Sequence, residues 1–393
     1  MKKTDWLPTF CLLILFIFTL SPAGAADKPT LFSWAAGRIA NLVTPGPAEA
    51  AGPGAPWEAQ WEKTVAAAKK EGKVVIYSSG GKETQTAFGD GLKKNFGIET
   101  DWVGGRGPAL SEKIMRERSA GLHIADVVIG ASQPALMTLK PAGALQKLEG
   151  ELILPEVIDP KAWLYGEFPW LDKDRYILAF MAYPDTTYIM NTNMVPPSEL
   201  TSFKDLLDPK WKGKIVMDDP TFPGSGGAFF IGISKIMGLD FMRQLVKQEP
   251  VLTRNRRLLV EWVARGKYAI GLAPHTPFLA GFQNAGAPLA IGRAKEGSYF
   301  NSGIGILSLM KEAPHPNAAR VFANWILTKE AQIAHAKITQ QQSYRDDIPI
   351  DYLAPIRRRD PDIKYTRLVT EEYLQNYRSN LKLSKEIFEP LKK

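Results

Sequence analysis

Residues 203–230, FKDLLDPKWKGKIVMDDPTFPGSGGAFF, are the stretch from which the fold of this chain can be predicted. They predict a short helix, a turn at Lys212-Gly213, a buried strand at Ile215–Met217, a loop of Pro, Gly and Ser, and a second helix. A glycine-rich loop between a strand and a helix leaves backbone N–H groups pointing outward at the positive end of the helix dipole, which favours anions. The loop residues Gly224, Ser225 and Gly226 are therefore a candidate anion cradle, and the alternative is a tight turn.

Two carboxylates, Asp218 and Asp219, precede this loop. Carboxylates at this position bind a cation or an amine, or they cap and pair at the end of the strand. The second interpretation is the one we favour.

The N-terminus predicts an exported protein. Lys2 and Lys3 are followed by an apolar run at Phe10–Leu20 and by the small residues Ala23-Gly24-Ala25. This is the pattern of a secretory signal peptide cleaved near Ala25, and the run is shorter than the roughly 20 residues that span a bilayer. An uncleaved anchor is the alternative. The only cysteine, Cys11, lies inside the run, so the mature chain forms no disulfide and no thiolate metal site. We expect a periplasmic location.

Length and charge limit the class of protein. A chain of 393 residues suits about two domains, and its net charge of +8 is moderate. Two short basic clusters, Arg254/Arg256/Arg257 and Arg357–Arg359, are interpreted as solvated faces. We expect no nucleic-acid partner, because the protein is expected to be exported and no aromatic residues alternate with the basic residues of these clusters.

Strands and helices alternate after an Ala/Pro/Gly-rich leader at 26–56. A helix begins at Trp57. An apolar strand is predicted at Val74–Tyr77 and further strands at Glu99–Val103 and Asp126–Ile129, each followed by a Gly/Ser loop and a helix. This alternation is typical of a parallel sheet covered by helices. Ligands of such sheets lie beyond the carboxyl ends of the strands, so the three loops are expected to converge on one place.

These three loops supply the first candidate ligand-binding residues. Ser78, Ser79 and Gly80 offer hydroxyl and N–H groups at a helix start, with simple helix capping as the alternative. Arg106 lies between glycines, and its guanidinium suits a carboxylate or phosphate; the alternative is a solvent-exposed loop arginine. Ser132 begins the helix after the third strand and either contacts the ligand or caps that helix.

A second set of elements follows a crossing segment at Tyr176–Met190, which Pro184 interrupts. Further strands are predicted at Ile215–Met217 and Tyr268–Ala273, and an apolar strand at Ser302–Met310 is predicted to return to the first set. Tyr183 and Tyr299 lie where the two crossings are expected to pass the ligand. They are candidate walls of a ligand pocket, and core packing is the alternative.

Three phrases of the sequence resemble a known family: FKDLLDPKWKGKIVMDDP, EWVARGKYAIGLA (261–273) and APHPNAARVFANWILTKEAQ (313–332). In order and over about 61–347, the chain resembles the extracellular solute-binding proteins of ABC importers, in the branch often called ferric-iron binding. The resemblance implies an α/β fold of the second periplasmic-binding-protein type: two lobes, each with a mixed, mostly parallel sheet flanked by helices, and one ligand in the cleft between them. It also implies a monomer without a cofactor, which delivers its solute to an inner-membrane permease.

The chain departs from the iron-binding members at one informative place. Those proteins carry two adjacent tyrosines just after a strand of the second lobe, whereas this chain has Ala273-Pro274-His275-Thr276 there and no adjacent tyrosine pair anywhere. Because ferric iron prefers phenolate and carboxylate ligands, a small anion is the preferred solute, and iron or another metal is the alternative. His275 is a candidate donor to that anion, or a loop histidine. Arg345 and Asp347 are predicted to form a structural ion pair.

The predicted organisation is a signal peptide (1–25), a leader (26–56), the first lobe (57–180 and 299–345), the second lobe (181–298) and a C-terminal helical segment (346–393). The sequence lacks the G-x-S-x-G, H-E-x-x-H and P-loop patterns, so an enzyme is not expected and a hydrolase is the less favoured alternative. A sensor that presents its loaded state to a receptor stays open as a further class.

Overall fold

The computed structural model describes residues 56–181, 183–274, 276–301, 305–353 and 358–391. The predicted signal peptide, nearly all of the leader and His275 lie outside these residues. The described residues belong to one compact unit, within which the strands form three sheets.

The first sheet gathers the three predicted N-terminal strands. Among the described residues it has the order β2-β1-β3-β13-β4, and β5 also pairs with β13. β1 is parallel to both β2 and β3, whereas β13 is antiparallel to β3, β4 and β5. Its strands are β1 Lys73–Ser78, β2 Glu99–Gly104, β3 Val127–Gly130, β4 Leu145–Gln146, β5 Leu178–Ala179 and β13 Ile306–Met310.

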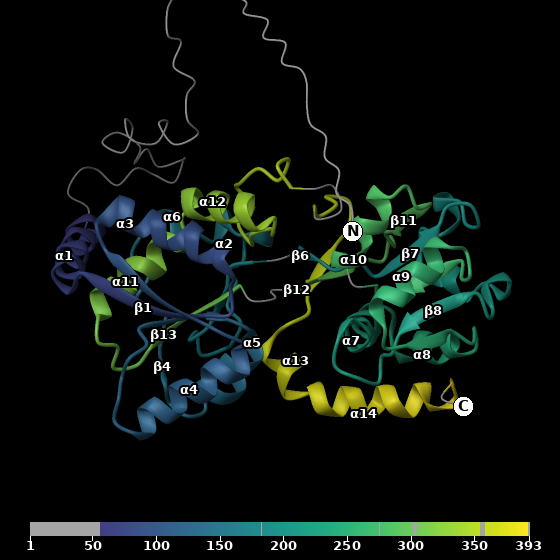
Figure 1. The fold of residues 1–393 in the computed structure, drawn as a ribbon, viewed down its shortest axis with the longest axis horizontal. Helices are drawn as coiled ribbons and strands as arrows, with labels where there is room; N and C mark the ends of the chain where they lie inside the picture. Colours follow the sequence, from purple (N-terminus) through teal and green to yellow (C-terminus); the bar gives the residue numbers. More distant parts are fainter. Residues whose placement is uncertain (1–55, 182, 275, 302–304, 354–357, 392–393) are drawn as a thin grey trace, which may run out of the picture. The chain divides into compact units, whose positions relative to one another are not determined.

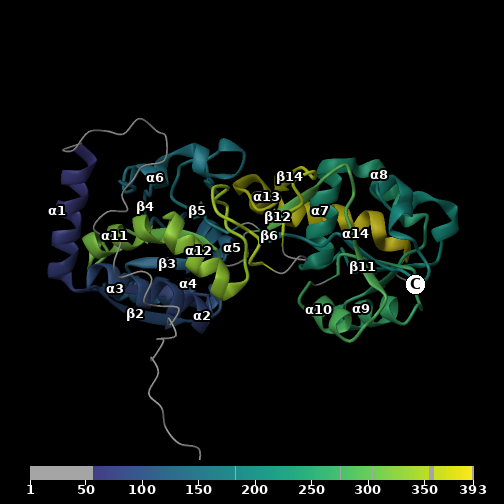
Figure 2. The same cartoon turned by 90° about the horizontal axis from the view of Figure 1, so that it is seen from above.

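Helices surround this sheet (Figures 1 and 2). α1 packs on α11, which is distant in sequence, and Gly72 ends α1 with a left-handed φ of 75°. The helices are α1 Pro56–Glu71, α2 Lys82–Gln85, α3 Gly91–Phe96, α4 Gly107–Ser119, α5 Ser132–Pro134, α6 Pro155–Ile158, α11 Pro316–Ile326 and α12 Lys329–Thr339.

The second sheet is built from residues 188–292. Its order among the described residues is β11-β7-β10-β8-β9, with β8 parallel to β9 and β10, and β7 antiparallel to β10 and β11. Its strands are β7 Tyr188–Asn191, β8 Ile215–Asp218, β9 Val251–Thr253, β10 Ile270–Leu272 and β11 Leu289–Gly292. Its helices are α7 Ser225–Met237, α8 Leu239–Val246, α9 Arg256–Ala264 and α10 Thr276–Asn284.

The chain crosses between these sheets twice through a small third sheet, β14-β12-β6. Going out, it passes from β5 through β6 (Tyr183–Pro184) to β7; returning, it passes from β11 through β12 (Ser298–Asn301) to β13. The crossings were predicted from the apolar segments around Pro184 and at Ser302–Met310. β6 lies in the first segment and β13 covers the second from Ile306, whereas residues 302–304 lie outside the described residues. β14 (Tyr365–Arg367) adds a third strand, parallel to β12.

The C-terminal segment then packs against elements of both large sheets (Figure 1). Its helices are α13 Glu371–Gln375 and α14 Tyr377–Phe388. Glu371 accepts hydrogen bonds from Lys140 Nζ (3.3 Å) and the Lys173 backbone N–H (3.0 Å). At the other end, Ser384 Oγ donates to the Pro220 carbonyl at 2.9 Å. The segment therefore bears directly on the loop that follows β8.

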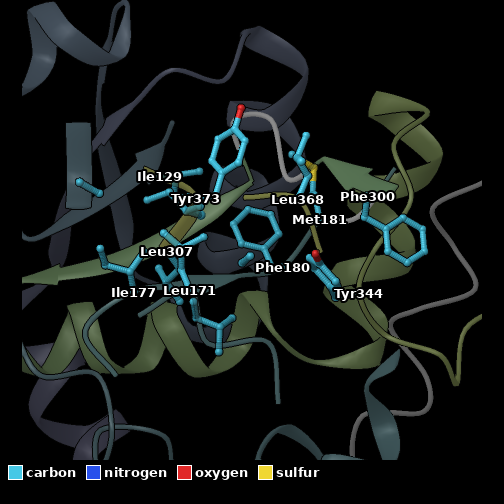
Figure 3. Packing of buried hydrophobic residues seen from close by; sticks show 14 of the residues in the cluster. Ile129, Leu171, Ile177, Phe180, Met181, Phe300, Leu307, Tyr344, Leu368 and Tyr373 are labelled. Carbon is cyan, nitrogen blue, oxygen red and sulfur yellow. The ribbon is translucent and has the colours of Figure 1, made fainter. Parts of the chain in front are cut away.

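A single large hydrophobic core runs through the first sheet, the crossing strands and part of the second sheet. Figure 3 shows part of it, where Ile129 and Leu307 of the first sheet gather with Phe180 of the first crossing and Tyr373 of α13. A smaller core, which includes Ile189 and Val216, fills the other face of the second sheet.

Short helical turns complete the fold. The 3₁₀ turns are η3 Pro160–Ala162, η4 Leu164–Gly166, η5 Pro197–Glu199, η6 Phe203–Leu207, η7 Pro209–Trp211 and η9 Glu389–Leu391, and the π turns are η1 Thr86–Asp90 and η2 Ala135–Leu139. The α/β class predicted from the sequence is confirmed. The predicted lobe boundaries at 180/181, 298/299 and 345/346 stay predictions.

Candidate solute site at the carboxyl edges of two sheets

The three loops of the first sheet meet, as the strand pattern predicted. Because β1 lies between β2 and β3 and is parallel to both, the three loops leave the sheet at the same edge. Ser79 N–H donates to the Ile129 carbonyl at 2.9 Å, and Gly105 N–H donates to the Ser78 carbonyl at 3.1 Å. The backbone thus holds the loops against one another.

The two serines of the first loop have different environments. Ser78 is fully buried, and its hydroxyl oxygen accepts the N–H of Gly80 at 2.9 Å, so it shapes the turn. Ser79 Oγ is buried, and no described residue forms a hydrogen bond with it. Two loop glycines lie next to this oxygen: a Cβ atom added at Gly130 would be 3.1 Å from it, and one added at Gly107 would be 3.5 Å from it. A buried hydroxyl without a partner is available to form a hydrogen bond with a solute or a water.

The other first-sheet candidates lie at starts of helices. Arg106 immediately precedes α4, its side chain is exposed, and it makes no capping hydrogen bond. Ser132 is the first residue of α5 and only 8% exposed. Arg106 precedes Gly107, and Ser132 follows Gly130 by two residues, so both candidates lie close in sequence to the two glycines near Ser79 Oγ. The first-sheet candidates therefore lie at one edge.

Two π-helical turns continue the short helices that begin after these loops, and sequence reasoning did not find them. η1 follows α2, and η2 follows α5, where the N–H of Lys140 donates to the carbonyl of Ala135 five residues earlier at 2.9 Å. Single π turns inside helices occur often at functional sites. They have no compositional signature that a hydrophobic pattern would reveal.

The second sheet presents the ends of β8, β10 and β11 at its own carboxyl edge, together with the start of β7. Here the loop of Gly224, Ser225 and Gly226 leads into α7, as predicted. However, Gly226 N–H donates to Asp218 Oδ2 at 2.8 Å, and Arg256 Nε lies 3.4 Å from the same oxygen. One of the N–H groups assigned to a solute therefore has an acceptor within the protein.

Both carboxylates before this loop act as internal partners, in agreement with the interpretation favoured from the sequence. Asp218 caps α7 and pairs with Arg256, and Asp219 Oδ1 accepts from the N–H and hydroxyl of Thr221 at 3.0 and 2.7 Å. Burial raises the pKa of Asp218, whereas the hydrogen bond from Gly226 and the charge of Arg256 oppose that shift.

A cavity opens beside the crossing strands at the edge of the second sheet. It encloses about 370 Å³ of free space, including its open mouth. Burial raises the pKa of the Asp185 carboxyl in its wall to about 6, and the hydrogen bond from Asn301 Nδ2 at 3.4 Å opposes this shift. The lining residues are Pro184, Asp185, Thr186, Thr187, Ile291, Gly292, Arg293, Ala294, Ser298, Arg358, Ile363 and Tyr365. Asp185 was missed from the sequence, although it directly follows the proline that marks the crossing.

The remaining aromatic and histidine candidates are placed as follows. Tyr299 is 2% exposed and lies against the Cα atom of Gly232 in α7, so it packs in the core. Burial raises the pKa of its phenol. Tyr183 is half-buried in β6. His275 lies outside the described residues, but Ala273, two residues before it, holds a left-handed φ of 54°, an unusual conformation for alanine.

The structure also bears on the predicted ion pair and on metal binding. Arg345 is 1% exposed and forms two hydrogen bonds of 2.8 Å with Asp347, which confirms the predicted structural ion pair. Among the described residues, no group of three or more His, Cys, Asp or Glu side chains is arranged to hold a metal ion.

Residues 87–349 match the family of bacterial extracellular solute-binding proteins. The chain belongs to this family. A curated protein of Haemophilus influenzae, itself uncharacterized, is 28% identical over 134 residues, which is 33% of this chain and 38% of that protein. The match therefore spans well under half of that relative.

Solved structures show the same fold as this solute-binding protein. The Trichodesmium protein IdiA (FutA), in complex with iron and citrate, has a TM-score of 0.61 at 20% identity, with 80% of this chain and 99% of that chain covered. AfuA of Actinobacillus pleuropneumoniae, with fructose-6-phosphate bound, has a TM-score of 0.54 at 19% identity, covering 81% and 99%. An ABC transporter structure from Clostridium perfringens has a TM-score of 0.61 at 16% identity, covering 81% and 99%.

These findings confirm the family resemblance and the two-lobed, type II periplasmic-binding-protein fold predicted from the sequence. The family is one of exported solute-binding proteins of ABC transporters. Within the described residues, no helix is both long and apolar enough to cross a membrane.

Proposed function

We propose that this protein captures a small anionic solute between the carboxyl edges of its two large sheets and delivers it to the membrane permease of an ABC importer. The observation that carries this proposal is the buried hydroxyl of Ser79, which lies where three loops meet and has no partner among the described residues. A hydroxyl that is available for a further hydrogen bond, at the edge where such sheets bind ligands, suits a solute that is rich in oxygen.

The anionic character rests on the charges and dipoles around that hydroxyl. Arg106 starts α4 at the same edge, and no acidic residue lies in the first turn of this helix. The helix N-terminus and the guanidinium both favour negative charge. Two proteins of the same fold have anions in their structures, citrate together with iron in one and fructose-6-phosphate in the other. These are properties of those proteins, and they guide the choice of probes for this one.

Export follows from the same proposal. A solute-binding component works outside the cytoplasmic membrane, and residues 1–25 carry the sequence pattern of a cleaved signal peptide. The protein is proposed to act as a periplasmic monomer without catalysis, with the permease and the solute as its partners. If a receptor takes the place of the permease, the capture step is unchanged.

A thermal-shift screen followed by calorimetry tests the proposal. The purified protein is titrated with citrate, fructose 6-phosphate, inorganic phosphate and neutral sugars, and with ferric citrate as the metal arm. A solute at about 100 times its Kd stabilises the folded state by about 2.7 kcal/mol, which raises Tm by a few degrees.

A matched pair of serine variants makes the screen specific for the proposed edge. Ser79→Ala is expected to weaken binding of the best anion by about 3- to 10-fold, the typical contribution of one hydrogen bond. Ser119→Ala is the control, because Ser119 is exposed at the far end of α4 and bonds to the Met115 carbonyl. Binding of neutral sugars alone would refute the anionic solute. Equal affinity of both variants would remove Ser79 from the site.

A further inference from the structure

The basic cluster Arg254, Arg256 and Arg257 lies at the carboxyl edge of the second sheet. β9 is parallel to β8 with Thr253 opposite Asp218, and Asp219 N–H donates to the Thr253 carbonyl at 3.0 Å. The residues that follow Thr253 therefore emerge beside the loop that leads into α7. From the sequence this cluster was interpreted as a solvated face, whereas the tertiary structure places it at the proposed solute edge.

The three arginines have different partners. Arg256 pairs with Asp218 and lies against the Cα atom of Gly224, where any side chain would collide with the guanidinium. Its charge is thus compensated within the protein. The Arg257 guanidinium lies 6.0 Å from the ring centre of Phe282 in the helix pair α9–α10.

Arg254 differs from Arg256 in having no carboxylate partner among the described residues, and from Arg257 in lying closer to an aromatic ring. Its guanidinium carbon lies 3.9 Å from the ring centre of Phe222, a residue of the loop between β8 and α7. Arg254 is exposed, and no carboxylate of the described residues forms an ion pair with it. A guanidinium that stacks on an aromatic ring is held in a fixed plane, while the N–H groups at its edge stay available for bidentate binding of a carboxylate or phosphate.

The N-terminus of α7 cannot supply all of this anion binding itself. The carboxylate of Asp218 already accepts the N–H of Gly226, and Asp218 and Arg256 together add no net charge. Of the three arginines, Arg254 and Arg257 have no ion pair within the described residues, and Arg254 is the one that lies on the loop between β8 and α7. Phe222 fixes that charge next to the loop of Gly224 and Ser225.

We propose that Arg254, held on the ring of Phe222, is the second-sheet residue that binds the carboxylate or phosphate group of the solute and sets the preference for anions. This inference rests on the proposed function, and it replaces Gly226 by Arg254 as the principal anion contact of that sheet. Ser79 and Arg106 then serve the solute from the first sheet.

Calorimetry with citrate, fructose 6-phosphate and inorganic phosphate on the purified protein and its variants tests the inference. Arg254→Gln is expected to weaken binding of the best probe by about 10- to 100-fold, as loss of a charge-assisted bidentate contact requires. Phe222→Leu, which keeps the charge but removes the stacking ring, is expected to weaken binding by about 2- to 5-fold. Arg257→Gln is the matched control with the same change of net charge and is expected to stay within twofold of wild type.

The outcomes distinguish a failure of the Arg254 contact from a failure of the proposed function. If the wild-type protein binds an anion and Arg254→Gln binds it within twofold, the inference is overturned while the proposed function stands. If Arg254→Gln and Arg257→Gln lose affinity equally, the effect is general electrostatics and the specific contact is likewise overturned. If the wild-type protein binds none of the anionic probes, the proposed anionic solute fails, and this inference fails with it. Preference for citrate or for the phosphate compounds decides between carboxylate and phosphate as the recognised group.

Discussion

The buried histidine His335 is expected to make the stability of this protein depend on pH. It lies in α12, is 1% exposed, and stacks on Phe88 with ring centres 4.6 Å apart and an interplanar angle of 5°. Phe180 meets the histidine ring edge-on at 5.8 Å. Its Nε2 atom is buried and finds no hydrogen-bond partner among the described residues. Burial in this apolar environment lowers the pKa of His335 from 6.5 to about 4.

The sign of the pH dependence follows from that shift. Below pH 6.5 the unfolded chain takes up a proton on His335, whereas the folded chain does not until the pH approaches about 4. The contribution of neutral His335 to the free energy of unfolding is therefore fully present above pH 6.5 and is lost as the pH falls toward 4. Each pKa unit corresponds to about 1.4 kcal/mol, so the total loss is about 3 kcal/mol, and about 2.5 kcal/mol of it is expected at pH 4.5.

The perturbation is His335→Phe, which keeps the stack on Phe88 and removes the titrating group. Urea denaturation is measured at pH 7.5 and pH 4.5 by tryptophan fluorescence. At pH 7.5 the variant is expected to lie within about 1.5 kcal/mol of wild type, because removal of an unpaired polar atom offsets the extra volume of phenylalanine. Between the two pH values, wild type is expected to lose about 2.5 kcal/mol more than the variant.

The change in stability between the two pH values is the decisive quantity, because other titrating groups are common to both proteins. His123→Gln is the control, since His123 has 34% of its side chain exposed beside Glu312. Parallel pH profiles for wild type and His335→Phe would refute the reasoning, since they would mean that the folded protein protonates His335 as easily as the unfolded chain.

Two further predictions concern buried contacts. Arg345→Met removes the bidentate pair with Asp347 and is expected to lower the free energy of unfolding by about 3–5 kcal/mol, measured by urea denaturation; a loss below 1 kcal/mol would show that the pair is not a stabilising contact. Gly226→Ala would bring a Cβ within 2.3 Å of the Asp218 carbonyl oxygen, so it is expected to lower Tm by several degrees and to weaken solute binding. Gly281→Ala is the control: its Cβ would meet nothing within 4 Å, and the change is expected to raise the free energy of unfolding by about 0.5–1 kcal/mol. A fully stable Gly226→Ala would contradict the tight approach at this loop.

The sequence alone predicted the elements whose signal is local. The apolar strands at Val74–Tyr77 and Ile215–Met217, with Gly/Ser loops and helices after them, required an α/β fold with loops at one edge, and β1 and β8 confirm them. The crossing at Pro184 was also visible, because proline interrupts an otherwise apolar run. These features depend on residue types within a window of a few positions, and the hydrophobic period reports them directly.

Which charged and polar residues contact one another at the site could not be predicted from the sequence. Asp218 and Gly226 are eight residues apart, and Asp218 and Arg256 are 38 apart, so nothing in the local pattern shows that they meet. The same holds for the contact of Arg254 with Phe222 and for the hydrogen bond that Lys140 donates to Glu371. Such contacts are set by strand register and helix packing, which bring together residues from distant parts of the chain.

What the sequence by itself determined is thus the class of fold, the family and the edge at which a solute is expected, because strand order and loop composition are encoded in local patterns. Only the tertiary structure decided which donors at that edge remain available. It left Ser79 Oγ buried without a partner among the described residues, and it gave the N–H of Gly226 to Asp218. The physical reason is that a polar group takes the nearest acceptor that folding brings to it, and that acceptor is a property of the packed chain.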